Sequence, residues 1–148
     1  MRANIIGFAL GVILLTLGVA VEAQQAIFLV RHGETVAPKG ADLRPLSETG
    51  QRRAVLLASL LKDAGINSIF TSDAERTVKT AEPLAQSLRI EPKALELLNT
   101  QFKQNDIDAF VARLRSDHRR DVVLVVGHSN SVPALLKAMG YPDRKSVV

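Results

Sequence analysis

The sequence of 148 residues contains no cysteine. This absence excludes a disulfide framework, a thiolate nucleophile and a zinc site built from thiolates. Histidine, aspartate and glutamate do not occur with the spacing of metal ligands either, so we expect no metal ion and no cofactor. Aromatic residues make up only 4% of the chain. They are not interleaved with basic residues in the way that is typical of nucleic-acid-binding segments.

The charge of the chain is modest and spread along its length. The formal net charge is +4 at pH 7, and Arg52-Arg53 and Arg119-Arg120 are the adjacent arginine pairs. We interpret the basic residues as a solvated surface with a few pocket arginines, and we expect no nucleic-acid partner. Hydrophobic residues amount to 47%, which at this length is enough for the core of one domain.

The first 23 residues have the pattern of a secretory signal. A short basic start, residues 1–4, precedes an apolar run over residues 5–21, and small residues then lead to Ala23. We expect cleavage after Ala23 or after Ala20. The alternative is an uncleaved membrane anchor formed by residues 5–21, because that run is nearly long enough to span a bilayer. Both interpretations place the following domain outside the cytoplasm, either periplasmic or secreted, and stable membrane association is expected only if the leader stays uncleaved.

The C-terminal end has a different character. Residues 143–148 continue no predicted element, and they match one reading frame of a common sequencing-library adapter. We therefore expect these residues to be a non-native tail and the folded domain to span residues 24–142. A natural stop codon directly after Val148 in genomic DNA would contradict this hypothesis.

Between these ends, apolar strand-like segments alternate with segments of helical periodicity, which is typical of an α/β fold. The expected strands span residues 26–30, 68–71, 92–98 and 122–126. The expected helices span residues 47–63, 73–88 and 106–115, and a last one, capped by Ser129 or Asn130, ends at Met139. In the first helix the residues expected to face the core are Ala54, Leu57, Ala58, Leu60 and Leu61, and in the third they are Ile107, Phe110, Val111 and Leu114. Strand 122–126 is apolar on both faces, which predicts a buried position in the sheet.

Two histidines each follow directly on a predicted strand. His32 lies in Arg31-His32-Gly33, and His128 lies in Gly127-His128-Ser129. Because strands of a parallel sheet end at the same edge, where α/β proteins bind ligands, we expect both imidazoles in one pocket. Arg31 offers a bidentate fork for phosphate oxygens, and Gly33 permits close approach of the backbone to a ligand. These residues suit a phosphate dianion and a nucleophilic histidine.

Each of these residues, taken alone, also has an ordinary structural explanation. A loop position would explain His32, and a capping or buried structural role would explain His128. Arg76, in the first turn of the second predicted helix, would be an ordinary solvated arginine if it paired with Asp73 or Glu75. The Arg-His-Gly context and the helix that starts beside His128, with its free N–H groups, favour an anion site instead.

Together, three segments in this order resemble the histidine phosphatase superfamily, and in particular the small bacterial members of its phosphoglycerate mutase-like branch. The matching residues are Arg31-His32-Gly33-Glu34-Thr35, then Thr71-Ser72 with Arg76-Thr77-Val78-Lys79-Thr80-Ala81, then Gly127-His128-Ser129. The resemblance extends from about residue 26 to residue 140. It implies a three-layer α/β/α sandwich around a mostly parallel sheet. Members usually continue with another strand after their last helix, and we expect that strand to be missing here through truncation, which would expose a sheet edge.

The resemblance also implies a mechanism. His32 attacks the phosphorus and forms a phosphohistidine, while the other nitrogen of its ring donates to a backbone carbonyl. Arg31, Arg76 and His128 hold the equatorial oxygens of the transferring group, and water then hydrolyses the phosphohistidine. Because the arginines supply the positive charge, this mechanism needs no metal.

Further residues complete the predicted site. Gly33, Ser129 and Asn130 are the expected substrate-binding residues, although N-capping would account equally for the last two. A leaving alcohol also needs a proton donor. Glu96 is the nearest match to the glutamate that serves this purpose in many relatives, and Glu34 is a second candidate because it is close to His32. An ordinary exposed carboxylate explains Glu96 equally well, and substrates with good leaving groups, such as phosphoramidates, need the acid less.

The leading hypothesis is an exported, metal-independent phosphatase that acts on a small phosphorylated molecule, either a phosphate monoester or a phosphoramidate. The alternative from another class is a non-catalytic protein that binds a phosphorylated ligand on the same fold. The complete set of histidines and arginines argues against that alternative, and the uncertain proton donor keeps it open. A phosphoglycerate mutase is disfavoured, because mutases use a longer insert to retain the intermediate and act on cytoplasmic sugars.

Overall fold

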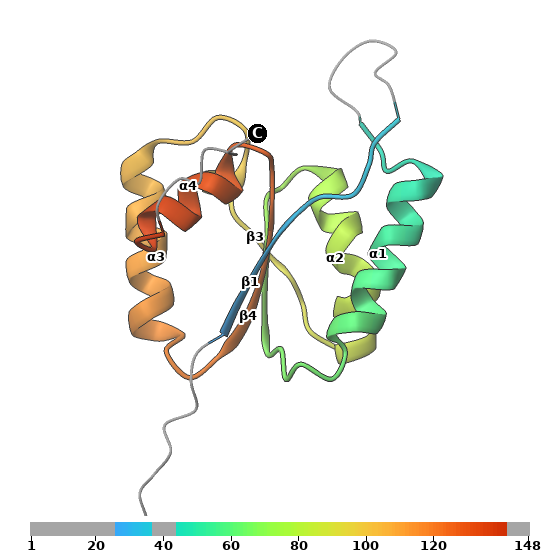
Figure 1. The fold of residues 1–148 in the computed structure, drawn as a ribbon, viewed down its shortest axis with the longest axis horizontal. Coiled ribbons are helices and arrows are strands. Elements are labelled where there is room, and N and C mark those ends of the chain that lie inside the picture. The colour runs from blue at the N-terminus through green and yellow to red at the C-terminus, as the bar shows by residue number, and fades with distance from the viewer. Residues whose placement is uncertain (1–25, 37–43, 142–148) are drawn as a thin grey trace, which may run out of the picture.

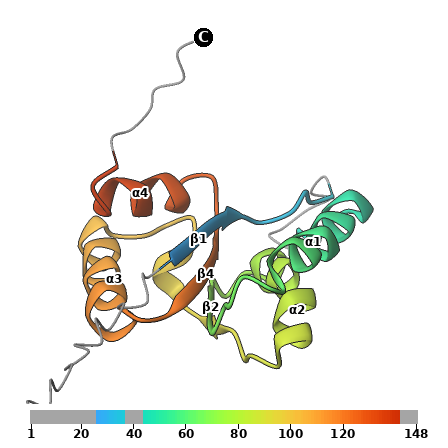
Figure 2. The same ribbon diagram turned by 60° about the horizontal axis from the view of Figure 1, so that its bottom comes forward.

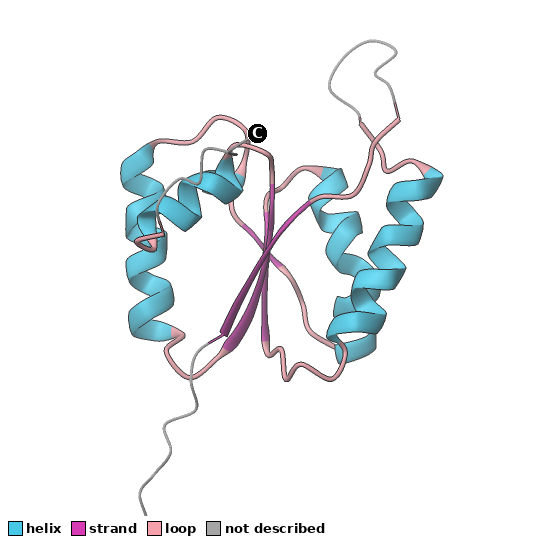
Figure 3. Ribbon diagram, in the orientation of Figure 1, coloured by secondary structure: helices cyan, strands magenta, loops and turns pink. Residues whose placement is uncertain are grey.

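The computed structural model describes residues 26–36 and 44–141. Four parallel strands lie in the order β1-β4-β2-β3: β1 (Ala26–Arg31), β2 (Ser68–Thr71), β3 (Lys93–Ala94) and β4 (Val122–Gly127). Helices α1 (Glu48–Leu61) and α2 (Glu75–Leu88) cover one face of the sheet, and α3 (Gln104–Asp117) and α4 (Ser131–Ala138) cover the other (Figure 1). The same three layers are seen in the colouring by secondary structure (Figure 3). The predicted α/β/α sandwich around a parallel sheet is therefore confirmed.

Strand β4 forms the centre of the core, because β1 and β2 pair with it on its two sides. Successive side chains of a strand point to opposite faces. Accordingly, Val123 and Val125 belong to the cluster under α3 and α4, and Leu124 and Val126 belong to the cluster under α1 and α2. All four are fully buried. The expectation of a strand that is buried on both faces is thus confirmed.

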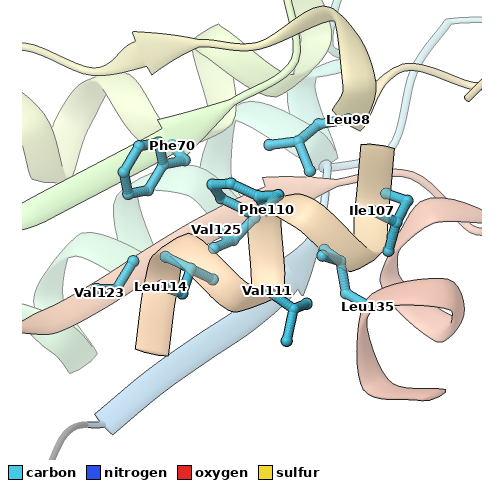
Figure 4. Packing of buried hydrophobic residues seen from close by; sticks show 9 residues of the cluster. All are labelled: Phe70, Leu98, Ile107, Phe110, Val111, Leu114, Val123, Val125 and Leu135. Atoms are coloured by element: carbon cyan, nitrogen blue, oxygen red, sulfur yellow. The ribbon is translucent and has the colours of Figure 1, made fainter. Parts of the chain in front are cut away.

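Helix α3 buries the residues that helical spacing predicts. Ile107, Phe110, Val111 and Leu114 are all buried and pack against the sheet (Figure 4). The ring of Phe110 meets that of Phe70 from β2 edge to face, with centroids 5.2 Å apart. Aromatic rings prefer this geometry to a face-to-face stack. The periodicity of the segment therefore identifies its buried face correctly.

The structure corrects two expectations about the elements. The predicted strand 92–98 is only the two-residue β3, which is followed by a single 3-10 turn, η1 (Glu96–Leu98). This turn directs Leu98 into the cluster beneath α3, where it is fully buried. Leu60 of α1, which was expected to face the core, is 70% exposed. Helix α1 is buried along Ala54 and Ala58, and two residues beyond Ala58 a helix has turned by about 200°.

Strand β1 forms one edge of the sheet. Among the described strands it pairs with β4 alone, and β3 forms the opposite edge. In the rotated view β1 crosses the front of the molecule and leads toward the loop before α1 (Figure 2). The expected leader and the C-terminal tail lie outside the described residues. Within the described ranges, no helix is both long enough and apolar enough to cross a membrane.

Candidate active site

The sheet register brings the two predicted motifs together. Arg31 at the end of β1 lies opposite Gly127 at the end of β4, and the His32 N–H donates to the Gly127 carbonyl oxygen at 3.0 Å. The rings of His32 and His128 consequently meet edge to face, with centroids 5.2 Å apart. Two segments almost a hundred residues apart in the sequence thus form one site at the carboxyl edge of the sheet.

The ring of His32 is fixed by a backbone hydrogen bond and has a lowered pKa. Its Nδ1 lies 2.7 Å from the Gly33 carbonyl oxygen, so Nδ1 carries the proton and donates, and Nε2 keeps its lone pair. Burial is the main cause that lowers the pKa of the ring below its ordinary value, while the hydrogen bond to Gly33 acts in the opposite direction. The charges of Arg76, Arg31 and Arg53 lower this pKa further. The imidazole is therefore neutral at neutral pH.

The loop after His32 is held by α1 and α2. The Gly33 N–H donates to Thr80 Oγ1 at 2.9 Å, and Thr80 Oγ1 donates in turn to the Arg76 carbonyl oxygen at 2.7 Å. Gly33 is buried, and an added Cβ there would lie 2.9 Å from the Gly50 carbonyl oxygen. The backbone of the first turn of α1 therefore lies close to Gly33, and a larger residue there would collide with it.

His128 is 1% exposed and is fixed at two points. Its backbone N–H donates to Ser131 Oγ at 2.9 Å, and its ring Nε2 lies 2.9 Å from Ser72 Oγ. Its Nδ1 is buried without a hydrogen-bond partner among the described residues. Burial is the largest cause that lowers the pKa of His128 to about 4, and the charges of Arg76 and His32 add to it. His128 is therefore also neutral near pH 7.

A chain of hydroxyl groups assigns the proton on His128. Thr77 Oγ1 lies 2.7 Å from the Ala74 carbonyl oxygen and donates its proton there. It therefore accepts from Ser72 Oγ, which lies 2.8 Å away. Because Ser72 has then used its only proton, it accepts from His128 Nε2. The proton thus lies on Nε2 and the lone pair on Nδ1.

Two guanidinium groups complete the positive surroundings. Arg31 is the exposed last residue of β1, and Arg76 lies in the first turn of α2. The charges of both lower the pKa of His32 and of His128, so both lie near the histidine pair. Arginine forks match the oxygens of a phosphate group, and two of them can bind a dianion. Within the described residues, no three histidine, aspartate or glutamate side chains are placed to hold a metal ion.

The two residues after His128 occupy the start of α4. Asn130 is its N-cap: Oδ1 accepts from the Ser131 N–H at 3.0 Å, and Nδ2 donates to the Thr100 carbonyl oxygen. Both polar atoms of Asn130 are therefore engaged with the chain, which gives this residue the capping role. Ser129 is exposed beside His128.

The two candidate proton donors differ in their surroundings. The exposed Glu34 pairs with Arg53. A hydrogen bond from its own backbone N–H lowers its pKa most, and the contact with Arg53 lowers it further. The protonated form of Glu34 is therefore disfavoured. Glu96 is exposed at the start of η1, beyond β3. In the described part of the chain, neither carboxylate is hydrogen-bonded to either histidine of the pair.

Buried hydroxyl groups are the functional feature that sequence reasoning did not identify. Ser72, Thr77, Thr80 and Ser131 are all buried and link the strand ends to the first turns of α2 and α4. In the second motif the resemblance gives a role to Arg76 but none to Ser72, Thr77 or Thr80, and it does not include Ser131. Their signal is positional, because each lies within ten residues after a strand that ends at the site.

Comparison with known proteins identifies the class. The model of the histidine phosphatase superfamily (branch 1) matches residues 27–102, about half of the chain. The chain belongs to this superfamily, as its motifs indicated.

Among curated proteins, a probable phosphoglycerate mutase, GpmB, of Photorhabdus laumondii is 35% identical over 95 residues, covering 58% of this chain and 44% of the relative. The protein of the same name from Proteus mirabilis is 40% identical over 90 residues, covering 55% of this chain and 42% of the relative. The matches thus span less than half the length of these relatives.

Solved structures show the same fold. A protein histidine phosphatase, SixA, complexed with tungstate superposes with a TM-score of 0.65 at 24% identity, over 74% of this chain and 73% of that one. A putative α-ribazole-5′-P phosphatase from Escherichia coli superposes with a TM-score of 0.67 at 19% identity, over 80% of this chain and 81% of that one. At these identities the likeness concerns the fold alone.

Proposed function

We propose that this chain is a metal-independent phosphatase that hydrolyses phosphate monoesters or phosphoramidates through a phosphohistidine on His32. The observation that carries the proposal is the state of the nucleophile. His32 is held neutral, with Nδ1 bonded to the Gly33 carbonyl oxygen, at a strand end where the charges of Arg76 and Arg31 lower its pKa. A neutral imidazole with a free Nε2 beside two guanidinium groups suits attack on a phosphorus atom.

The reaction proceeds in two displacements. Nε2 of His32 forms a bond to phosphorus as the bond from phosphorus to the leaving oxygen or nitrogen breaks, and the leaving group takes up a proton. Water then attacks the phosphorus, loses a proton, and releases inorganic phosphate and neutral His32. Arg31 and Arg76 stabilise the negative charge on the equatorial oxygens in both steps.

The two carboxylates predicted as proton donors for an ester leaving group, Glu34 and Glu96, differ in their surroundings. A hydrogen bond from its own backbone N–H and the pair with Arg53 lower the pKa of Glu34 and disfavour its protonated form, so we propose Glu96 as the donor. Phosphoramidates and acyl phosphates leave readily without such help. We therefore propose that substrates with good leaving groups react fastest.

Hydrolysis is favoured over a mutase reaction by the short connection between α2 and α3. A mutase must retain its phosphohistidine until the phosphoryl group returns to the substrate, so it needs structure that covers the site. Between Leu88 and Gln104 the chain forms only β3 and the single turn η1. Such a site admits water to the intermediate.

The first test is hydrolysis of p-nitrophenyl phosphate in the presence of EDTA. The expected result is activity that survives EDTA and falls at least about a thousandfold in His32→Ala, with His118→Ala as the matched control. Loss of activity with EDTA would contradict metal independence, and an active His32→Ala protein would contradict the assigned nucleophile. A folded protein that binds phosphate without hydrolysing the ester would support the non-catalytic alternative.

We also propose that the domain is exported. The basic start of the chain and the apolar run over residues 5–21 support this proposal. The test is N-terminal sequencing of the protein recovered from the periplasm or the medium of an expressing bacterium. A mature end directly after Ala23 or Ala20 would support export with cleavage. An intact N-terminus in the membrane fraction would support the anchored alternative, and recovery from the cytoplasm would contradict both.

A further inference from the structure

The two edges of the sheet differ in length and in composition. At one edge, β3 has only two residues, both exposed, and one of them is Lys93. At the other edge, β1 (Ala26–Arg31) has six residues, and the first five are apolar and half-buried. Short edge strands and lysine side chains discourage a sheet from pairing with another chain. The edge at β3 is therefore protected, whereas the edge at β1 is not.

The backbone of β1 presents unpaired groups on its outer side. The His32 N–H donates to the Gly127 carbonyl oxygen, and alternate residues of a strand direct their N–H and C=O groups to opposite sides. The backbone groups of Ile27, Leu29 and Arg31 therefore point away from β4. Among the described strands, only β4 pairs with β1. The outer side of β1 can consequently form a second ladder of hydrogen bonds.

An apolar groove lies beside β1 on the face that α3 and α4 cover. Its volume is about 450 Å³, and its lining includes Ile27 and Leu29 of β1 together with Leu136 and Tyr141. The last two side chains are 39% and 63% exposed. Arg115 also lines the groove, but its Nη2 donates to a carbonyl oxygen at the end of α4, where helices attract cations. The groove is therefore suited to apolar side chains.

Exposed apolar surface also flanks β1 on the opposite face. Arg53 of α1 pairs with Glu34, which follows β1 in the sequence. Leu60 lies two helical turns after Arg53 and thus on the same side of α1, the side turned toward β1. Its side chain is 70% exposed. The open edge of β1 is accordingly bordered by exposed apolar residues on both faces of the sheet.

We propose that the outer edge of β1 is an interface that binds a second copy of this chain, through antiparallel pairing of the two β1 strands. A two-fold axis perpendicular to the sheet, near the middle of β1, makes the strands antiparallel and keeps the α3 and α4 layers of both copies on one side. Leu136 and Tyr141 of the two copies then meet on that side, and the two Leu60 side chains approach each other on the other. This inference does not depend on the catalytic proposal.

The size of this edge fits a second copy. A strand of six residues extends about 20 Å, and a sheet with a helix layer on each face is about 30 Å deep. The interface then covers about 600 Å² on each copy, at the lower end of the range for specific complexes. Antiparallel pairing also places the two Arg31 side chains at opposite ends of the interface, so that they do not repel each other.

The segment that follows Tyr141 in the sequence is less suited to this edge. Pro142 has no N–H to donate to a neighbouring strand, and residues 143–145 are all charged. This composition does not match the apolar surface beside β1. A second β1 matches it, because a two-fold axis places each apolar patch opposite its own copy.

The first test is the association state of the full chain, measured by sedimentation velocity. The expected result is a dimer that dissociates on dilution from about 100 µM to about 1 µM, because an interface of this size gives modest affinity. Leu60→Lys and Leu136→Lys bring like charges together across the axis, and each is expected to weaken the dimer at least about tenfold. All variants keep the leader, so association through residues 5–21 would not respond to these substitutions.

Val55→Lys is the matched control for Leu60→Lys. Val55 is also an exposed apolar residue of α1, but it lies about 140° around the helix from Leu60. It is expected to leave the dimer unchanged. A chain that is monomeric throughout this range, or a dimer that is indifferent to both Leu60→Lys and Leu136→Lys, overturns the inference.

Because the chain has no cysteine, a single introduced thiol reports the strand pairing directly. At the axis of an antiparallel pair, a residue lies opposite its own copy with Cα atoms about 4.5–5.5 Å apart, within reach of a disulfide. Phe28→Cys or Leu29→Cys, whichever residue lies at the axis, is expected to form a disulfide-linked dimer on mild oxidation, and Val55→Cys is not. Absence of the link in both β1 variants overturns the antiparallel pairing.

Hydrogen exchange distinguishes a second copy from another segment of the same chain. The Ile27 and Leu29 N–H groups are expected to exchange slowly in the dimer and rapidly after dilution to the monomer. Slow exchange in the monomer would mean that the chain covers its own edge, and this result overturns the inference.

Discussion

The two ends of the sheet hold histidines in opposite surroundings. At the carboxyl edge, His32 and His128 have backbone and hydroxyl partners, and the charges of arginines lower the pKa of both. At the amino edge, His118 Nδ1 lies 2.6 Å from Asp121 Oδ2. The Asp121 carboxylate also accepts hydrogen bonds from Asn67 and Ser68, which connects the turn before β4 to the start of β2.

The difference lies in the charge of the neighbours. The hydrogen bond with His118 is the largest cause that lowers the pKa of Asp121, so this carboxylate stays charged and links two strands. At the other edge, burial and the charge of Arg76 lower the pKa of His32 and His128. A histidine beside a carboxylate is suited to hold structure together, whereas a buried histidine beside arginines remains neutral and can act as a nucleophile.

The largest expected effect is a dependence of the stability on pH, which arises from a histidine at the carboxyl edge of the sheet. The pKa of His128 is about 4 in the folded protein against 6.5 in the unfolded chain. As the pH falls below 6.5, the unfolded state takes up a proton that folded His128 does not, so stability falls until about pH 4 and this group then contributes no further change. Over this pH range the free energy of unfolding falls by about 3 kcal/mol. Urea unfolding at pH 7, 5.5 and 4 measures it.

A variant of His128 and the different pH window of Asp121 distinguish the contributions of the two edges to the pH dependence of stability. His128→Gln is expected to flatten the slope between pH 6.5 and 4, leaving the smaller part due to His32. Asp121 acts in a different window, because its lowered pKa gives stability that is present above 3.8 and is lost as the pH falls below it. An unchanged slope in His128→Gln would show that His128 does not resist protonation.

The second effect concerns the hydroxyl group that orients His128. Ser72→Ala removes the acceptor of the Nε2 proton and leaves a buried donor without a partner, which costs about 2 kcal/mol. We expect the free energy of unfolding to fall by about this amount, and kcat/KM for p-nitrophenyl phosphate to fall because His128 loses its fixed orientation. The matched control is Ser68→Ala at the amino edge, which is expected to change kcat/KM less than about twofold. Equal effects of the two variants would contradict the assigned role of Ser72.

The smallest effect belongs to the pair at the amino edge. Asp121→Asn removes the charge beside His118 but keeps most of the shape, so unfolding above pH 4 should become easier by about 1 kcal/mol. Its kcat/KM should remain that of the wild type. Thermal unfolding and steady-state kinetics on the same preparation measure both quantities. Reduced activity at unchanged stability would show that the two edges are coupled.

Much of the site is predictable from the sequence, because it depends on where strands end. His32 and His128 each follow an apolar segment, and parallel strands deliver their last residues to one edge whatever their order. The four buried residues of α3 are likewise predictable from helical spacing alone. The local sequence pattern is sufficient to predict the buried residues of an element that packs on the sheet through a single apolar face.

The features that the sequence does not predict depend on how each helix is rotated about its axis and on which neighbouring elements pack against it. Helix α1 has apolar residues on several sides, including the exposed Val55, Leu56 and Leu60, so its pattern does not define one buried face. The same rotation places Arg53 beside Glu34, and the sequence therefore does not predict that ion pair. Leu98 lies in a turn instead of a strand because α3 offers it a buried position.

The register between β1 and β4 has a consequence for the order in which the protein folds. Ala26 pairs with Val122, 96 positions later in the sequence. Closing so long a loop is among the entropically most expensive contacts of the chain, so this pairing is expected late in folding. During synthesis β1 emerges first, yet it has no strand to pair with until β4 has left the ribosome. The two histidines at the ends of β1 and β4 are thus brought together only after β4 has been made.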